Sequence, residues 1–164
     1  EAADLLGDLP KERAEGILME MEKDIAEDVK ELLSHHEEKA GGMMTTSFLG
    51  FPPTLKATDA LEAIRREAED RDFIYYIYVV DDHEHLLGML SLRELLVAPP
   101  QIPLSGLMDT RVVSVNLEAG KEEIASHFAK YGIMALPVVD EENSIQGVIL
   151  FKNLLEVVAP NLGK

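Results

Sequence analysis

The chain has 164 residues, 46% of them hydrophobic, with no cysteine and a net charge of −16. This composition indicates a folded globular protein and excludes a disulfide framework or a thiolate metal site. The negative charge disfavours binding to nucleic acids or anionic lipids, and it attracts cations. Residues 1–40 hold 13 acidic and 5 basic residues, so this part of the chain carries half of the net charge. The longest apolar run, 73–80, is far shorter than the ~20 residues of a membrane-spanning helix.

The first segment of the chain has the pattern of amphipathic helices. Pro10 suits a first helical turn, and Ala14, Ile17 and Met21 follow at helical spacing. Acidic residues and lysines occupy most of the remaining positions. The spacing predicts an all-α segment over 1–40, which is too short to bury its apolar stripes alone. We interpret it as the remnant of a larger helical domain.

The rest of the chain contains one pattern twice, at an offset of 59 residues. The segment 77–82 (IYVVDD) corresponds to 136–141 (LPVVDE), and 88–96 (GMLSLRELL) corresponds to 147–155 (GVILFKNLL). An internal repeat at a fixed spacing indicates two similar structural units. Two such units, packed together, predict a cleft between them in which a ligand could bind.

Each unit has the predicted order β-α-β-β-α. The first unit covers 41–100 and begins at Gly41-Gly42, a signal for a break in the chain. It is expected to hold a helix with Ala60 and Ile64 on its inner face, followed by a strand at 73–80, a turn at 81–83, a strand at 86–90 and a helix at 92–97. The second unit covers 101–164, with strands expected at 112–115, 136–139 and 145–149 and helices at 122–130 and 152–158. The predicted fold class is therefore α+β, two repeats packed as a pseudo-twofold pair after an all-α segment.

This repeat resembles the paired cystathionine-β-synthase (CBS) domain module, a regulatory ligand-binding unit. The matching pieces are LMDT at 107–110, LPVVDEE at 136–142, and the glycine-containing strand that leads into the last helix of each unit. Three further stretches resemble the MgtE-type magnesium transporters in particular: AGGMMT at 40–45, the whole of 75–100, and KYGIMALPVVDEENSIQGVI at 130–149. The resemblance covers nearly the whole chain.

The resemblance implies a cytosolic magnesium sensor. It implies that the chain forms a homodimer through its CBS helices and closes the transmembrane pore domain of the same transporter, at the cytoplasmic face of the cell membrane. It does not imply an enzyme, and the sequence contains no HExxH, GxSxG, P-loop or Rossmann glycine motif.

Carried over residue by residue, the resemblance implies a set of Mg²⁺ ligands. Three are acids, two contribute backbone carbonyls, and one is an amide at a position where the family usually has aspartate: Glu1, Glu122, Glu156, Gly42, Ala129 and Asn153. Gly120 and Gly132 stand where acids are expected, so at least one family site is weakened or absent. Scattered oxygen ligands still suit Mg²⁺, because this ion keeps several waters and needs few carboxylates.

A competing ligand is an adenine nucleotide, ATP or AMP, bound between the repeats. In the first unit Ser91 and Arg93 are placed to meet phosphate, Glu94 to meet the ribose hydroxyls, and Tyr76 to stack on the base. The second unit has Leu150 in place of the hydroxyl and Asn153 in place of the acid. The sequence therefore predicts at most one nucleotide site, and Ser91 is equally compatible with a simple helix N-cap.

Two further interpretations remain open. A purely structural dimerisation module with decayed sites is compatible with the glycines at 120 and 132 and with Leu150. The run of acids and histidines at 81–85 could resemble a metal cluster, but in a hairpin its neighbouring side chains point apart, so we predict a solvated turn.

Overall fold

The computed structural model describes residues 38–68 and 74–159, so the predicted helices of 1–37 lie outside the described residues. The first repeat contains β1 (Gly50–Phe51), α5 (Ala57–Glu67), β2 (Tyr76–Val80), β3 (Leu86–Ser91) and α6 (Leu92–Val97). The second contains β4 (Val115–Asn116), α7 (Lys121–Tyr131), β5 (Ala135–Val139), β6 (Ile145–Leu150) and α8 (Phe151–Val158). A one-turn helix, α4 (Ala40–Met43), precedes them, and a 3-10 helix, Leu104–Gly106, lies between the repeats. This order confirms the predicted α+β class with two β-α-β-β-α repeats.

The two sheets have the same topology and the same register. In each, the short first strand runs parallel to the middle strand, which pairs antiparallel with the last strand. Tyr76 pairs with Ser91 in the first sheet, and Ala135 pairs with Leu150 in the second, at the same offset of 59 residues. Even the register shift recurs, between residues 79 and 80 and between residues 138 and 139.

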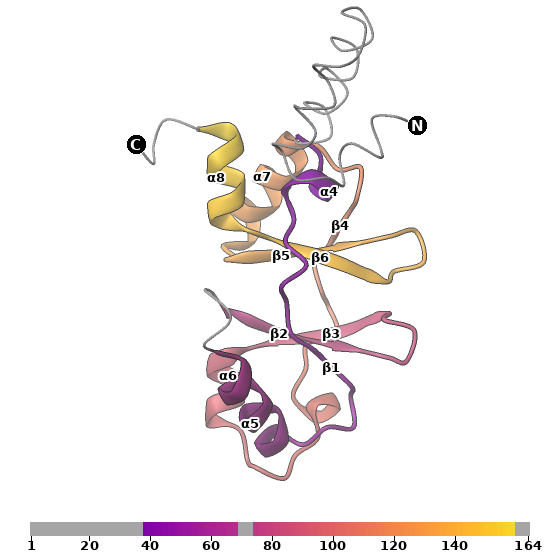
Figure 1. The fold of residues 1–164 in the computed structure, drawn as a ribbon, viewed down its shortest axis with the longest axis vertical. Helices are drawn as coiled ribbons and strands as arrows, with labels where there is room; N and C mark the ends of the chain where they lie inside the picture. The colour runs from indigo at the N-terminus through magenta and orange to yellow at the C-terminus, as the bar shows by residue number, and fades with distance from the viewer. Residues whose placement is uncertain (1–37, 69–73, 160–164) are drawn as a thin grey trace, which may run out of the picture.

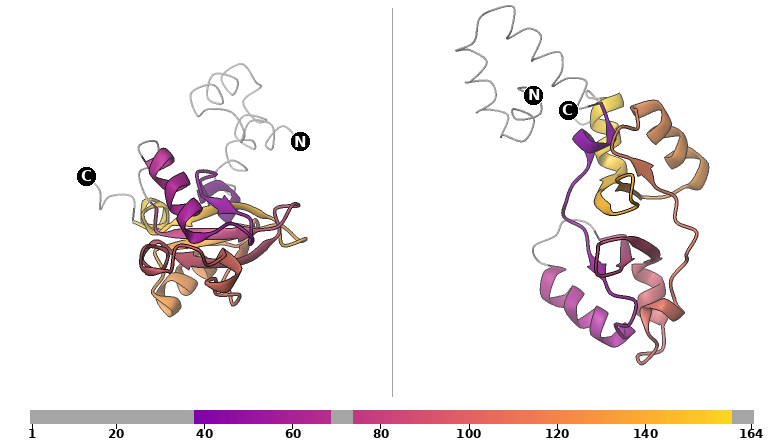
Figure 2. Two further views of the ribbon diagram at one scale, coloured as in Figure 1. Left: turned by 90° about the horizontal axis from the view of Figure 1, so that it is seen from below. Right: turned by 90° about the vertical axis from the view of Figure 1, so that its right-hand side faces the viewer.

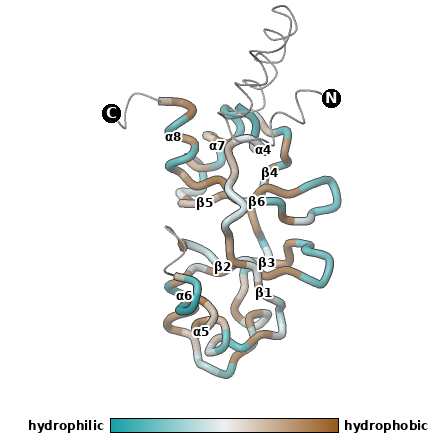
Figure 3. The backbone as a smooth tube through the Cα atoms, viewed as in Figure 1, coloured by the Kyte–Doolittle hydropathy of each residue, from teal (hydrophilic) through white to brown (hydrophobic). Residues whose placement is uncertain are grey.

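The sheets face each other across a shared apolar layer, and the helices cover their outer faces (Figure 1). The buried residues of this layer come from both repeats: Tyr78, Val80, Leu86, Val139, Ile145 and Val148. Each repeat also has its own core beneath its helices, centred on Ile77 and Leu90 in the first and on Leu136 and Ile149 in the second. Figure 3 shows hydrophilic residues at the tips of both hairpins, where the chain meets water.

The segments that lead into the repeats are exchanged. Ala40 donates its N–H to the Ala119 carbonyl at 2.9 Å, and Thr45 forms a backbone bridge with Val148, so α4 packs in the core of the second repeat. In return Leu104 is buried in the core of the first repeat. Figure 2 shows the two connecting segments running between the repeats on opposite sides of the molecule. The segment that leads into each repeat therefore packs with the core of the other repeat.

Three predicted local features differ in the structure. The strand predicted at 112–115 is β4 at Val115–Asn116, because Val112 packs between the sheets instead of pairing with a neighbouring strand. The strand predicted at 73–80 begins at Tyr76. Gly41-Gly42 does not break the chain but lies inside α4.

Candidate functional site

A cleft of about 260 Å³ opens between the two repeats. Its polar lining comes from β2, β3 and α6 of the first repeat, from the connecting segment, and from the end of α7: Tyr76, Ser91, Glu94, Asp109, Arg111 and Tyr131. Its apolar wall consists of Met89, Leu90, Val113, Ile133, Ala135 and Pro137. An apolar cleft with a few convergent polar groups is the usual form of a small-molecule site.

The cleft brings together three of the four residues predicted for nucleotide binding. Tyr76, Ser91 and Glu94 all line it, whereas Arg93 is exposed on α6 and is not among the lining residues. The Tyr76 hydroxyl accepts a hydrogen bond from the Met134 N–H at 3.3 Å, which ties the first repeat to the second at the edge of the cleft.

Ser91 and Glu94 form a capping box at the start of α6. The Ser91 hydroxyl accepts the Glu94 N–H at 3.1 Å, and the Glu94 carboxylate accepts the Ser91 N–H at 3.0 Å. These bonds satisfy donors that would otherwise be free at the helix start. They also hold the Glu94 carboxylate in place at the lining of the cleft.

Sequence reasoning missed Asp109, Arg111 and Tyr131. Asp109 pairs with Met89 through two backbone hydrogen bonds of 2.8 and 3.0 Å, so the connecting segment forms one edge of the cleft. Tyr131 is stacked on His127 at the end of α7, with ring centroids 5.9 Å apart, and 45% of it is exposed. The sequence held one signal for these residues, the similarity between LMDT at 107–110 and MMTT at 43–46. This similarity does not reveal that each segment packs against the other repeat.

The equivalent cleft on the other side of the pseudo-twofold axis is smaller. The part beside Phe48 and Tyr78 holds only about 20 Å³, and these two rings pack edge to face there, with centroids 6.1 Å apart. A pocket of about 120 Å³ adjoins it and shares Tyr75 and Leu150 with it. Leu150 stands in this cleft where Ser91 stands in the first. Burial raises the pKa of the Tyr78 phenol strongly, the nearby Tyr76 adds to the rise, and the Tyr78 hydroxyl has no hydrogen-bond partner among the described residues.

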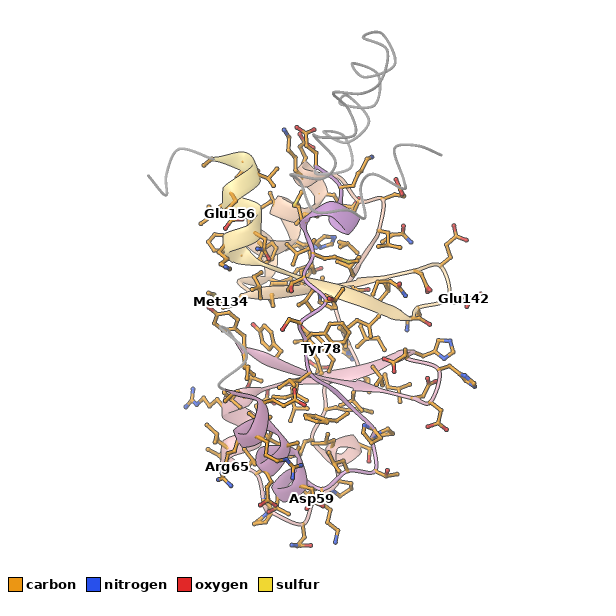
Figure 4. All side chains as sticks on the ribbon, in the orientation of Figure 1. Asp59, Arg65, Tyr78, Met134, Glu142 and Glu156 are labelled. Atoms are coloured by element: carbon orange, nitrogen blue, oxygen red, sulfur yellow. The ribbon has the colours of Figure 1, made fainter. Side chains whose placement is uncertain are left out.

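The described residues predicted as Mg²⁺ ligands lie on three helices, α4, α7 and α8. Glu122, Glu156, Gly42 and Ala129 are exposed, and Figure 4 shows Glu156 on α8, at the opposite end of the molecule from Asp59 and Arg65 on α5. The sixth predicted ligand, Glu1, lies outside the described residues.

Asn153 has a structural bond already. Its side-chain oxygen accepts the Leu150 N–H at 2.9 Å at the start of α8.

Within 38–68 and 74–159, no three histidine, cysteine, aspartate or glutamate side chains are grouped closely enough to hold a metal ion. The turn at 81–85 is likewise not a metal cluster among the described residues. The Asp81 carboxylate accepts the N–H groups of His83 and His85 and lies 2.8 Å from the His85 ring nitrogen.

Comparison with known proteins identifies the class first. The CBS domain model matches residues 40–100 and 104–160, so the chain belongs to the CBS domain family and contains a CBS domain pair, a regulatory unit that is not itself catalytic. Within this family it is homologous to the cytosolic regions of MgtE magnesium transporters. It is 38% identical over 131 residues to the magnesium transporter MgtE of Thermus thermophilus, and 32% identical over 133 residues to that of Enterococcus faecalis.

Those matches cover 80% and 81% of this chain but 29% of each relative, so the chain spans less than a third of the length of these transporters. Among solved structures, it is similar to the soluble part of a magnesium transporter, with a TM-score of 0.76, 30% identity, and coverage of 98% of this chain and 62% of the other. It is also similar to the cytosolic domain of the Mg²⁺ channel MgtE in complex with ATP, with a TM-score of 0.73, 31% identity, and coverage of 95% and 79%. In the part of the chain that the structure describes, no helix is long and apolar enough to cross a membrane.

Proposed function

We propose that this chain is the magnesium-sensing regulatory region of an MgtE-like transporter. In this proposal Mg²⁺ binds between acidic surfaces, the regulatory domains close, and closure gates a transmembrane pore domain at the cytoplasmic face of the membrane. The chain would act as a homodimer through its CBS helices. The observation that carries the proposal is the homology to MgtE transporters over 80% and more of the chain.

The distribution of the acidic residues supports an ion held between surfaces. Glu122 lies in the first turn of α7, Glu156 lies on the neighbouring α8, and both are exposed. A chain with a net charge of −16 repels itself when two acidic surfaces approach, and Mg²⁺ would relieve this repulsion. Because Mg²⁺ retains waters, one or two carboxylates from each surface suffice.

The test is thermal unfolding of this chain during a Mg²⁺ titration at constant ionic strength. We expect Mg²⁺ to stabilise the wild type by about 2.7 kcal/mol at ~100 times its dissociation constant, since the ion binds only the folded state. The double variant Glu122→Gln with Glu156→Gln is expected to lose this response, because both carboxylates are removed.

The matched control is Glu62→Gln with Glu142→Gln, which removes the same charge from exposed positions on α5 and on the β5–β6 hairpin. We expect the control to keep the Mg²⁺ response. A response that Na⁺ reproduces at equal ionic strength, or that both double variants share equally, would contradict the proposal.

A second candidate function is the binding of an adenine nucleotide, ATP or AMP, in the open cleft. The specific observation in its favour is that Tyr76, Ser91 and Glu94, predicted for a nucleotide, all line one cleft. A solved relative was crystallised with ATP, which adds support. We expect a nucleotide to raise the melting temperature without Mg²⁺, and equally in the Glu122→Gln with Glu156→Gln variant, because those residues lie outside the cleft. If neither Mg²⁺ nor a nucleotide changes the melting temperature, the structural dimerisation module is the remaining interpretation.

A further inference from the structure

The charged residues of the open cleft, the one lined by Ser91, Glu94 and Arg111, determine where each part of a nucleotide can bind. This inference rests on the proposed nucleotide binding. Two carboxylates line the cleft, on Glu94 and Asp109. Among the described residues, Arg111 is the single lysine or arginine in the lining. A ligand phosphate therefore has one cationic partner in the cleft, and its position decides where the phosphate lies.

The α6 side of the cleft is unfavourable for phosphate. In the capping box the Ser91 hydroxyl accepts the Glu94 N–H, so this N–H is not free to bind a phosphate. The Glu94 carboxylate occupies the helix start, where its negative charge repels a phosphate. Arg93 follows on α6 but does not line the cleft. This wall suits a ribose diol, whose hydroxyls donate to a carboxylate, better than it suits an anion.

The opposite wall presents Arg111 in a defined turn. The Arg111 N–H donates to the Asp109 carboxylate at 2.9 Å, and Asp109 is itself held to Met89 by two backbone bonds. The Asp109 oxygen is thus partly satisfied by the backbone. The Arg111 side chain is exposed and forms no ion pair with another described residue, so its guanidinium is available to a ligand.

The turn at 45–47 of the first repeat corresponds to the turn at 109–111, but it carries no arginine. In the first repeat the Ser47 N–H donates to the Thr45 hydroxyl at 3.1 Å, which reproduces the Asp109–Arg111 turn. Ser47 lines the smaller cleft at the position that corresponds to Arg111. The same turn therefore carries a cationic side chain only in the larger cleft.

We infer that Arg111 is the phosphate-binding residue of the open cleft, and that the cleft selects a nucleoside monophosphate over a triphosphate when no divalent cation is present. Glu94 holds the ribose, and the aromatic rings of Tyr76 and Tyr131 offer stacking surfaces for the base. The second and third phosphates of a triphosphate add negative charge beside Glu94 and Asp109, and no further basic residue of the described lining offsets it.

The experiment measures the affinities of adenosine, AMP and ATP by calorimetry in EDTA, for the wild type, Arg111→Gln and the matched control Arg93→Gln. We expect AMP to bind the wild type at least as tightly as ATP. We expect Arg111→Gln to weaken AMP by about tenfold to a hundredfold, the usual effect of losing a charge-assisted hydrogen bond, with adenosine unchanged within about twofold. Arg93→Gln is expected to leave all three affinities unchanged.

Several outcomes would overturn the inference alone and leave nucleotide binding intact. These are ATP binding the wild type tenfold more tightly than AMP, Arg111→Gln weakening adenosine as much as AMP, or Arg93→Gln weakening AMP more than Arg111→Gln does. If neither adenosine nor AMP binds the wild type, the nucleotide function itself fails together with the inference. Circular dichroism of each variant separates lost binding from lost folding.

Discussion

Replacing Leu136 by alanine is expected to lower the free energy of unfolding by about 2–5 kcal/mol, the usual cost of truncating a leucine in a close-packed core. Leu136 lies in the middle of β5 with 0% exposure. It packs in the core of the second repeat, where Ile124, Phe128 and Ile149 belong to the same cluster. Because these neighbours come from α7 and β6, the cavity cannot close without moving a helix or a strand. Denaturant unfolding, with the midpoint and slope both fitted, measures the loss.

The matched control is Leu96→Ala on α6, which removes the same atoms from a side chain that is 60% exposed. This change is expected to alter the free energy of unfolding by no more than about 0.5 kcal/mol. Equal losses in the two variants would show that Leu136 is not part of a close-packed core.

Gly147→Ala is expected to cost about 1–3 kcal/mol, because the added methyl group has no room. A Cβ atom at this position would lie 2.7 Å from the Met44 sulfur and 2.8 Å from the Thr45 carbonyl oxygen. The flexible methionine can move, but the Thr45 backbone is fixed by hydrogen bonds of 2.8 and 2.9 Å to Val148. The methyl group therefore pushes the exchanged segment away from β6. The loss is measured by denaturant unfolding.

Gly50→Ala is the control for this prediction. A Cβ atom at Gly50 would lie no closer than 3.6 Å to its neighbours, an ordinary contact distance. Because alanine also restricts the unfolded chain, this variant is expected to be neutral or stabilised by up to about 1 kcal/mol. A Gly147→Ala variant as stable as Gly50→Ala would contradict the close approach of the exchanged segment.

The regular part of the fold could be predicted because the repeat is encoded locally. The alternating apolar residues and the 59-residue offset predicted the hairpins β2–β3 and β5–β6, whose registers are the same in the structure. The first strand of the second repeat could not be placed, because the apolar pattern of 112–115 reflects packing at 112 and strand pairing only from 115. The hydropathy of a segment indicates that it is buried, but it does not distinguish packing between the sheets from pairing in a strand.

The site was predictable on one wall only. Tyr76, Ser91 and Glu94 follow from a short motif in the first repeat, and they line the cleft. Arg111 and Asp109 belong by sequence to the second repeat, and they reach the cleft because their segment pairs with Met89 of the first. No local pattern signals a contact between segments that are far apart in the chain.

The exchanged segments also determine how the chain can unfold. Thr45 and Val148 are bridged although they lie 103 positions apart in the sequence, and Ala40 and Met43 complete the core of a repeat whose strands begin only at Val115. Neither repeat contains all of its own core, so unfolding of one repeat removes core residues from the other. The pair is therefore a single cooperative unit, and its folding requires long-range loop closure, which slows folding relative to two independent hairpin domains. A ligand that stabilises the cleft is expected to stabilise both repeats at once, and such a coupled response would suit the sensing role proposed above.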